Sequence, residues 1–159
     1  MLPMSDATPA KAICYLAEYE FGVDEKRRVQ IPSKWRPEVV ETDFEYVLFR
    51  WQPEPGKPVC LLVLPPESMG RLRLKMAELS YSDRQAETLR RSLTRASDTA
   101  TLDSAGRIVL PQRLAEAAGI RKRAVLVVMF DRFQVWSPEN YELVRAEDEA
   151  NTSEALKLI

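Results

Sequence analysis

The fold is decided by residues 102–111, which read Leu102-Asp103-Ser104-Ala105-Gly106-Arg107-Ile108-Val109-Leu110-Pro111. An earlier stretch matches them, and residues 23–32 read Val23-Asp24-Glu25-Lys26-Arg27-Arg28-Val29-Gln30-Ile31-Pro32, at an offset of 79. A second pair of matching blocks, residues 63–69 and 135–141, follows in the same order at an offset of 72. Two matched blocks in one order predict that the chain contains an internal duplication.

Both copies predict the same succession of elements. The expected strands are 19–23, 28–31, 46–51 and 59–64 in the first copy and 98–102, 107–110, 125–130 and 133–136 in the second. A polar turn separates the first two strands of each copy, and a short helix is expected after each proline, most clearly over 111–118. Further helices are expected over 67–79, 83–95 and 138 to about 150, the last with Ser137 as its N-cap.

These elements favour an α+β fold. Antiparallel hairpins without a parallel crossover predict a small antiparallel β-barrel of two internally duplicated halves with flanking helices, related by a pseudo-twofold axis. A half of about 70 residues seldom buries enough apolar surface alone, so we expect the halves to pack on each other. The expected division is an N-terminal extension (1–14), a first half (15–80), a linking helix (81–97), a second half (98–148) and a C-terminal tail (149–159).

Several side chains have predicted structural roles. Ser82 and Gln85 have the spacing of a capping box at the start of the linking helix. The apolar positions of helix 67–79 are expected in the core, and they are Met69, Leu72, Met76 and Leu79. Core packing is also expected for Cys14 and Cys60 and, in preference to stacking on bases, for Trp35, Trp51 and Trp136.

Composition excludes most classes of enzyme. The 159 residues contain no histidine and two cysteines, which removes His-dependent nucleophilic catalysis and His-containing metal sites. No phosphate-binding glycine loop or nucleophile–base spacing stands out. We therefore expect a non-enzyme with no cofactor, metal or small-molecule substrate. An apolar run of membrane-spanning length is missing, and the start lacks a secretory pattern, which together indicate a cytoplasmic protein without a membrane partner.

Charge is unevenly distributed along the chain. The net charge is −1, but residues 67–123 hold twelve basic and seven acidic side chains, a local charge of +5. Residues 124–159 hold three basic and seven acidic side chains, a local charge of −4. Since a phosphate backbone meets only one face of a protein, this asymmetry is compatible with nucleic-acid binding.

The two polar turns hold the candidate binding residues, which are Asp24, Lys26, Arg27 and Arg28 in the first turn and Asp103, Gly106 and Arg107 in the second. Each turn has the pattern Asp-x-x-x-Arg. An arginine at a hairpin tip can bind guanine O6 and N7 in the major groove, and an aspartate can fix the turn or orient that arginine. The alternative interpretation is a polar hairpin turn with an exposed ion pair worth under about 1 kcal/mol.

On these residues the sequence resembles the MraZ family, bacterial transcription regulators built from two SpoVT/AbrB-like halves. The resemblance covers roughly residues 15–145. It is closest over 102–111, 118–120, 125–127 and 131–136, and the first half retains 24–28, 31–32 and 34–36. Two Asp-x-x-x-Arg patterns in one chain of this length are a specific signal.

The resemblance implies a sequence-specific DNA-binding repressor of the bacterial division and cell wall gene cluster. It also implies a ring-like homo-oligomer whose turns bind repeated sites in double-stranded promoter DNA, and hence association with the nucleoid. On the family pattern, Asp24, Lys26 and Arg28 form the first signature turn, and Asp103, Gly106 and Arg107 form the second.

The chain departs from the family pattern at a few positions. Arg27 stands where the first turn normally has glycine, so this turn is expected to adopt a different backbone or to place a bulkier residue. Ala105 replaces the usual lysine of the second turn, and Val128 and Phe130 stand at usual glycine positions. These departures and the acidic final third motivate a second hypothesis, an oligomeric interaction scaffold with the same fold that has lost DNA recognition.

Overall fold

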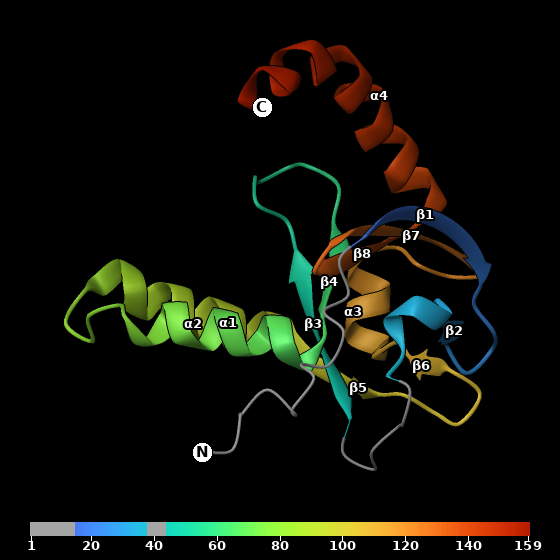
Figure 1. Ribbon diagram of the computed structural model, residues 1–159, viewed down its shortest axis with the longest axis horizontal. Coiled ribbons are helices and arrows are strands. Elements are labelled where there is room, and N and C mark those ends of the chain that lie inside the picture. Colours follow the sequence, from blue (N-terminus) through green and yellow to red (C-terminus); the bar gives the residue numbers. More distant parts are fainter. Residues whose placement is uncertain (1–14, 38–43) are drawn as a thin grey trace, which may run out of the picture.

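The computed structural model describes residues 15–37 and 44–159, so the predicted N-terminal extension and Cys14 lie outside the described residues. Two sheets and several helices make up an α+β architecture (Figure 1). The strands are β1 (Tyr15–Gly22), β2 (Arg28–Gln30), β3 (Glu45–Trp51), β4 (Cys60–Leu64), β5 (Ser97–Thr101), β6 (Arg107–Val109), β7 (Arg123–Phe130) and β8 (Arg132–Trp136). The helices are α1 (Pro66–Ala77), α2 (Arg84–Ala96), α3 (Gln112–Ala117) and α4 (Pro138–Ala155), with short 3-10 turns η2 (Ser33–Trp35) and η3 (Leu156–Leu158).

The strand order reflects the duplication. The described strands form a six-stranded sheet with the order β1-β7-β8-β4-β3-β5 and a two-stranded sheet of β2 and β6. All of the pairings are antiparallel. When each strand is replaced by its counterpart in the other copy, the order becomes its own reverse. The α+β class and the antiparallel sheet are confirmed, whereas closure into a barrel of AbrB-like halves stays a prediction.

The main core lies between the six-stranded sheet, the two-stranded sheet and α3. Every residue of β4 is buried, which fits its place in the interior of the sheet and its continuous apolar sequence. Trp35 is fully buried and meets Phe133 edge-to-face, with ring centroids 4.7 Å apart. Tyr46 donates a hydrogen bond to the carbonyl oxygen of Trp35 at 2.5 Å. Trp35 and Trp136 are therefore packing residues, and Cys60 is a buried free thiol whose pKa burial raises to about 12.

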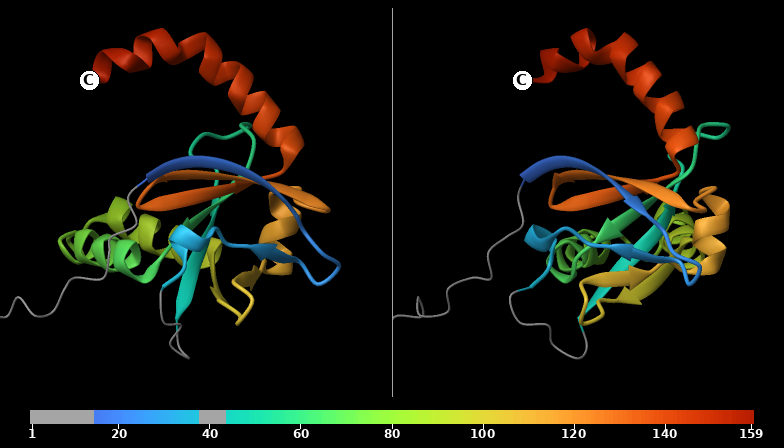
Figure 2. Two further views of the ribbon diagram at one scale, coloured as in Figure 1. Left: turned by 45° about the vertical axis from the view of Figure 1, so that its right-hand side comes forward. Right: turned by 90° about the vertical axis from the view of Figure 1, so that its right-hand side faces the viewer.

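Helices α1 and α2 cover the other face of the sheet. Phe49, Leu62 and Leu64 point to that face and pack against a few residues of the two helices. The two helices form a hairpin that projects beyond the sheet (Figures 1 and 2). Of the four apolar positions expected in the core, Met69 and Leu72 pack half-buried against this cluster and Met76 is half-buried, but the prediction was wrong for Leu79, which lies beyond the end of α1 and is 36% exposed.

The helix ends differ in detail from the sequence predictions. Asp83, not Ser82, caps α2, because its Oδ1 accepts hydrogen bonds from the N–H groups of Gln85 and Ala86 at 2.8 and 3.3 Å. Ser82 instead meets the hydroxyl of Ser80. The helix expected after Pro32 is only the 3-10 turn η2, whereas Ser137 caps α4 as predicted. Helix α4 continues beyond the expected end to Ala155 and points away from the sheets (Figure 1).

Candidate nucleic-acid interface

The first turn, residues 24–28, is organised by the carboxylate of Asp24. Its Oδ1 accepts hydrogen bonds from the backbone N–H groups of Lys26 and Arg28 at 2.9 and 2.8 Å. Its Oδ2 lies 2.5 Å from Nε of Arg28. The N–H of Arg27 also donates to the carbonyl oxygen of Asp24 at 2.9 Å. One aspartate thus closes the turn and orients the arginine that follows it.

The second turn, residues 103–107, repeats these contacts. Oδ1 of Asp103 accepts from the N–H groups of Ala105 and Arg107 at 2.9 and 2.8 Å, and Oδ2 lies 3.1 Å from Nε of Arg107. The N–H of Gly106 donates to the carbonyl oxygen of Asp103 at 3.1 Å. The Asp-x-x-x-Arg pattern therefore encodes one local structure, which the chain uses twice.

The turns share a left-handed residue. Gly106 has φ +79° and Arg27, at the matching position, has φ +61°. The turn with arginine in place of glycine therefore keeps the same local backbone and does not adopt a different one. Its side chain has a structural use, because Nε of Arg27 donates a hydrogen bond to the carbonyl oxygen of Leu110 at 2.9 Å.

Hydrogen bonds between the copies hold each turn in place. The N–H of Leu110 donates to the carbonyl oxygen of Arg27, and the N–H of Ile31 donates to the carbonyl oxygen of Gly106, both at 2.8 Å. These bonds extend the pairing of β2 with β6 at its two ends. Each turn is thus fixed to the strand of the other copy, and the two turns lie at opposite ends of one short ribbon.

The ribbon has a buried face and an outward face. Val29 and Ile108 are paired and almost fully buried. Because side chains alternate along a strand, the remaining members of the pairing point outward, and they are Arg28, Gln30, Arg107 and Val109. Arg28 lies opposite Val109, and Arg107 lies opposite Gln30. The ribbon lies away from the projecting α1–α2 hairpin (Figure 1).

The two outward arginines keep hydrogen-bonding capacity. The side chains of Arg28 and Arg107 are 33% and 34% exposed, respectively, and each donates from Nε to its own aspartate. Among the described residues, no hydrogen-bond acceptor contacts the Nη1 and Nη2 atoms of either arginine. Both guanidinium groups can therefore offer a pair of N–H donors to a ligand.

Both aspartates are held in the charged form. The N–H of Arg28 contributes most to lowering the pKa of Asp24, and the Arg28 guanidinium adds to this effect. Burial opposes ionisation of Asp103, but the N–H groups of Arg107 and Ala105 and the charge of Arg107 outweigh it, so the pKa of Asp103 is also lowered. The ion pairs thus persist at neutral pH and orient the arginines.

Other basic residues surround the two turns. Lys26 is exposed at the tip of the first turn. The run Arg121-Lys122-Arg123 lies beside the same turn, because the N–H of Val23 donates to the carbonyl oxygen of Lys122 at 2.8 Å. Arg123 contacts Glu20 at 2.7 Å. The first turn therefore has the more basic surroundings, and part of them come from the second copy.

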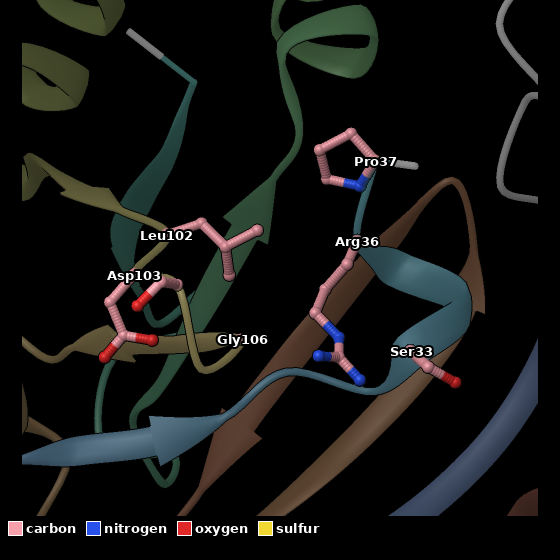
Figure 3. A pocket seen from close by; sticks show the side chains of 7 residues that line it. Ser33, Arg36, Pro37, Leu102, Asp103 and Gly106 are labelled. Atoms are coloured by element: carbon pink, nitrogen blue, oxygen red, sulfur yellow. The ribbon is translucent and has the colours of Figure 1, made fainter. Parts of the chain in front are cut away.

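Sequence reasoning missed two residues of this region. Gln30 is half-buried and donates to the carbonyl oxygen of Gly106 at 3.1 Å, which adds a contact to the second turn. Arg36, which follows η2, lies over the same turn (Figure 3). Neither contact has a local sequence signal, because the residues in contact are about 70 positions apart and only the duplicated fold brings them together.

Two chemical alternatives find no support in the described part of the chain. No group of three or more cysteine or carboxylate side chains there could hold a metal ion. Across residues 15–37 and 44–159, we find no helix with the length and apolarity needed to cross a membrane.

The fold and the paired turns define a class: a duplicated α+β protein with an arginine-bearing ribbon between its copies. A family model described as "MraZ protein, putative antitoxin-like" matches residues 93–157. "Transcriptional regulator MraZ" of Clostridium tetani is 31% identical over 128 residues, covering 80% of this chain and 84% of that protein. The protein of the same name from Alkaliphilus oremlandii is 29% identical over 140 residues, covering 88% and 92%.

A third relative, "Transcriptional regulator MraZ" of Thermomicrobium roseum, is 31% identical over 139 residues, covering 84% of this chain and 91% of that protein. The chain belongs to the MraZ family. The family resemblance of the sequence is thereby confirmed. The relatives have the name of a regulator and not of an enzyme, as the sequence predicts.

Proposed function

We propose that this protein is a DNA-binding transcription regulator that contacts the major groove with the outward face of the β2–β6 ribbon. The observation that carries the proposal is the placement of Arg28 and Arg107 on that one face, each oriented by its own aspartate. The names of the relatives support the regulatory role. The seven residues predicted from the two turns are the proposed DNA-binding site.

The dimensions of the ribbon suit a base-reading element. A two-stranded antiparallel ribbon fits the major groove of B-form DNA. Arg28 and Arg107 are displaced by two residues along the ribbon, which is about 7 Å at the rise of an antiparallel strand. The rise of B-form DNA is about 3.4 Å per base pair. The two guanidinium groups therefore suit guanines about two steps apart, each bound through O6 and N7.

The remaining cations suit the phosphate backbone. Lys26 is exposed at the tip of the first turn, and the run Arg121-Lys122-Arg123 flanks it. Such contacts give affinity without sequence preference and weaken as salt is added. Arg27 is assigned neither to base recognition nor to phosphate contact, because its Nε donates a hydrogen bond to the carbonyl oxygen of Leu110. Its positive charge contributes to the electrostatic field around the first turn.

The finer functional statements rest on the family resemblance. We infer that the protein is a repressor of the division and cell wall gene cluster, that its two halves are AbrB-like, and that it assembles as a ring-like homo-oligomer on repeated promoter sites. Cytoplasmic location at the nucleoid follows from that role. No cofactor or small-molecule ligand enters this proposal.

The test is a set of equilibrium binding isotherms on the promoter upstream of the protein's own gene and on a shuffled sequence of equal length. The expected result is tighter binding to the promoter by at least about tenfold at moderate salt, with steep salt dependence on both sequences. Assembly of the protein without preference for its promoter would instead support the scaffold hypothesis.

A further inference from the structure

Arg36 occupies an unusual position over the second turn. An ideal Cβ placed on Gly106 would lie 2.1 Å from Nη1 of Arg36 and 2.8 Å from its Cδ and Cζ. The guanidinium therefore fills the space that any larger residue at position 106 would need. In the first turn the matching position is Arg27, whose own side chain leaves from that point. Each turn thus has a guanidinium group at its left-handed residue, supplied in one case from a distant segment.

A hollow of about 310 Å³ opens beside this guanidinium. It is lined by residues of the segment after β2 and of the second turn, which are Ser33, Arg36, Pro37, Leu102, Asp103, Ser104 and Gly106. Arg36 reaches into it between the Ser33 segment and the second turn (Figure 3). The hollow is therefore bordered by a cation and by the turn that holds Arg107.

The charge of Arg36 lacks a neutralising partner among the described residues. No carboxylate of residues 15–37 or 44–159 forms an ion pair with it. Its Nε is buried and has no hydrogen bond. Asp103 lines the hollow, but its oxygens accept from Arg107 and from the N–H groups of the turn. A partly buried cation that faces an open hollow and lacks a partner favours an anion of matching size.

We propose that this hollow binds one phosphate group of the DNA backbone next to the second turn, with Arg36 as the residue that contacts it. This inference rests on the proposed DNA-binding function and deepens it. Ala105 leaves the second turn without a basic residue before Arg107, and Arg36 supplies the missing positive charge from the first copy. A side chain at position 106 would have to displace the guanidinium of Arg36, and it would also have to adopt the positive φ of Gly106.

The experiment compares Arg36→Gln with the parent and with Arg91→Gln, which removes an exposed charge from α2 far from the turn. Isotherms are measured on promoter and shuffled DNA at about 50 and about 200 mM salt. Losing one phosphate contact makes the fall of log K with log salt less steep by about 0.9. The parent should therefore lose about three- to fourfold more affinity than Arg36→Gln over this range, with unchanged promoter preference. Arg91→Gln should keep the parental slope.

A second measurement locates the phosphate. Single neutral methylphosphonates are placed along the promoter, and the affinity loss at each is compared for the parent and Arg36→Gln. Neutralising one particular phosphate should weaken DNA binding by the parent but leave DNA binding by Arg36→Gln unaffected. If Arg36→Gln fails to fold, Arg36→Lys is used in the same comparison and should reduce the effect at that phosphate. Absence of any phosphate coupled to Arg36, or a parental salt slope in Arg36→Gln, overturns the proposal.

A third measurement separates DNA from free phosphate as the source of the anion. Chloride is exchanged for inorganic phosphate at constant ionic strength, and direct binding to the parent and to Arg36→Gln is measured by calorimetry. Binding at millimolar or higher concentration is expected. Tight Arg36-dependent binding of free phosphate with no change in the DNA slope would overturn the DNA assignment. Failure of the parent to prefer its promoter is a different result and contradicts the proposed function itself.

Discussion

Arg27 shows how one residue can occupy a position that its family fills with glycine. A left-handed backbone is unfavourable for residues with a Cβ by roughly 1 kcal/mol, and Arg27 has φ +61°. The hydrogen bonds of Asp24 close the turn around it, and its Nε and carbonyl oxygen both contact Leu110. The local contacts thus offset the backbone strain, which composition and spacing could not indicate.

Substitutions at Arg27 should separate the strain from the side-chain contact. Arg27→Ala and Arg27→Gly both lose the Nε hydrogen bond to Leu110, but only alanine keeps the left-handed strain. We expect Arg27→Gly to be more stable than Arg27→Ala by about 1 kcal/mol, since glycine adopts positive φ freely. Urea unfolding at neutral pH measures the difference. Equal stability of the two variants would contradict the proposal that the left-handed backbone at position 27 is strained.

At the scale of elements, local sequence patterns predict correctly the features that depend only on residues close together in the chain. The matched blocks predict the turns, and the prolines correctly mark where β2 and β6 end. Packing between elements was less predictable. Leu79 has an apolar side chain but remains exposed. It lies beyond the end of α1, in the part of the α1–α2 hairpin that projects past the sheet. Arg36 contacts a turn from the other copy, and no local signal could place it there.

Asp131 links α1 to the β7–β8 hairpin. Ser68 donates a hydrogen bond to the carbonyl oxygen of Asp131, and Arg71 contacts Oδ2 of Asp131 at 2.9 Å. Arg132 contacts Oδ1 at 3.0 Å and is the main cause that lowers the pKa of Asp131 to about 2. A carboxyl group with a lowered pKa in the folded state stabilises the fold above its unfolded pKa.

Asp131→Asn should therefore reduce stability at neutral pH, by less than about 1 kcal/mol because the ion pairs are partly exposed to solvent. The unfolded carboxyl has a pKa of 3.8, so the contribution is complete above that value and is lost as pH falls toward about 2. Chemical unfolding at pH 7 and at successive acid steps should show parent and variant converging. A difference that stays constant down to pH 2 would exclude the ionic contribution.

At the scale of the molecule, the two copies are interleaved. β1 of the first copy pairs with β7 of the second, and β5 of the second pairs with β3 of the first. The central contact is between β4 and β8. Each copy forms one hairpin of its own, β3–β4 or β7–β8, but β1, β2, β5 and β6 pair only with strands of the other copy, so the two copies share one six-stranded sheet and one ribbon.

Assembly of several chains would multiply the number of ribbons presented to DNA. Each ribbon spans only a few base pairs, so specificity gains from effective concentration when neighbours bind adjacent repeats. Exposed apolar side chains on the projecting hairpin, Leu74, Leu79 and Leu89, offer contact surface. Light scattering at micromolar protein should give a mass well above 18.2 kDa. A monomer at that concentration would remove the ring proposal but not the fold.

The ribbon as a whole predicts separate effects for its two arginines. Arg28→Ala and Arg107→Ala each remove one pair of donors, so each should reduce promoter preference by about 1–3 kcal/mol. Because the two arginines are displaced by about 7 Å along the ribbon, each variant should relax preference at a different base pair, about two steps apart. Lys26→Ala should instead weaken binding to every sequence and flatten the salt dependence.

Isotherms on promoter variants with single base-pair changes, at two salt concentrations, measure these effects. Arg27→Ala should lower overall affinity through charge and turn stability while leaving promoter preference nearly intact, since its Nε is bound to Leu110. Asp24→Ala should release Arg28 and lower both promoter preference and melting temperature, because Asp24 holds the turn as well as the guanidinium. If Arg28→Ala and Arg107→Ala both retain the parental promoter preference, the two turns serve only the fold.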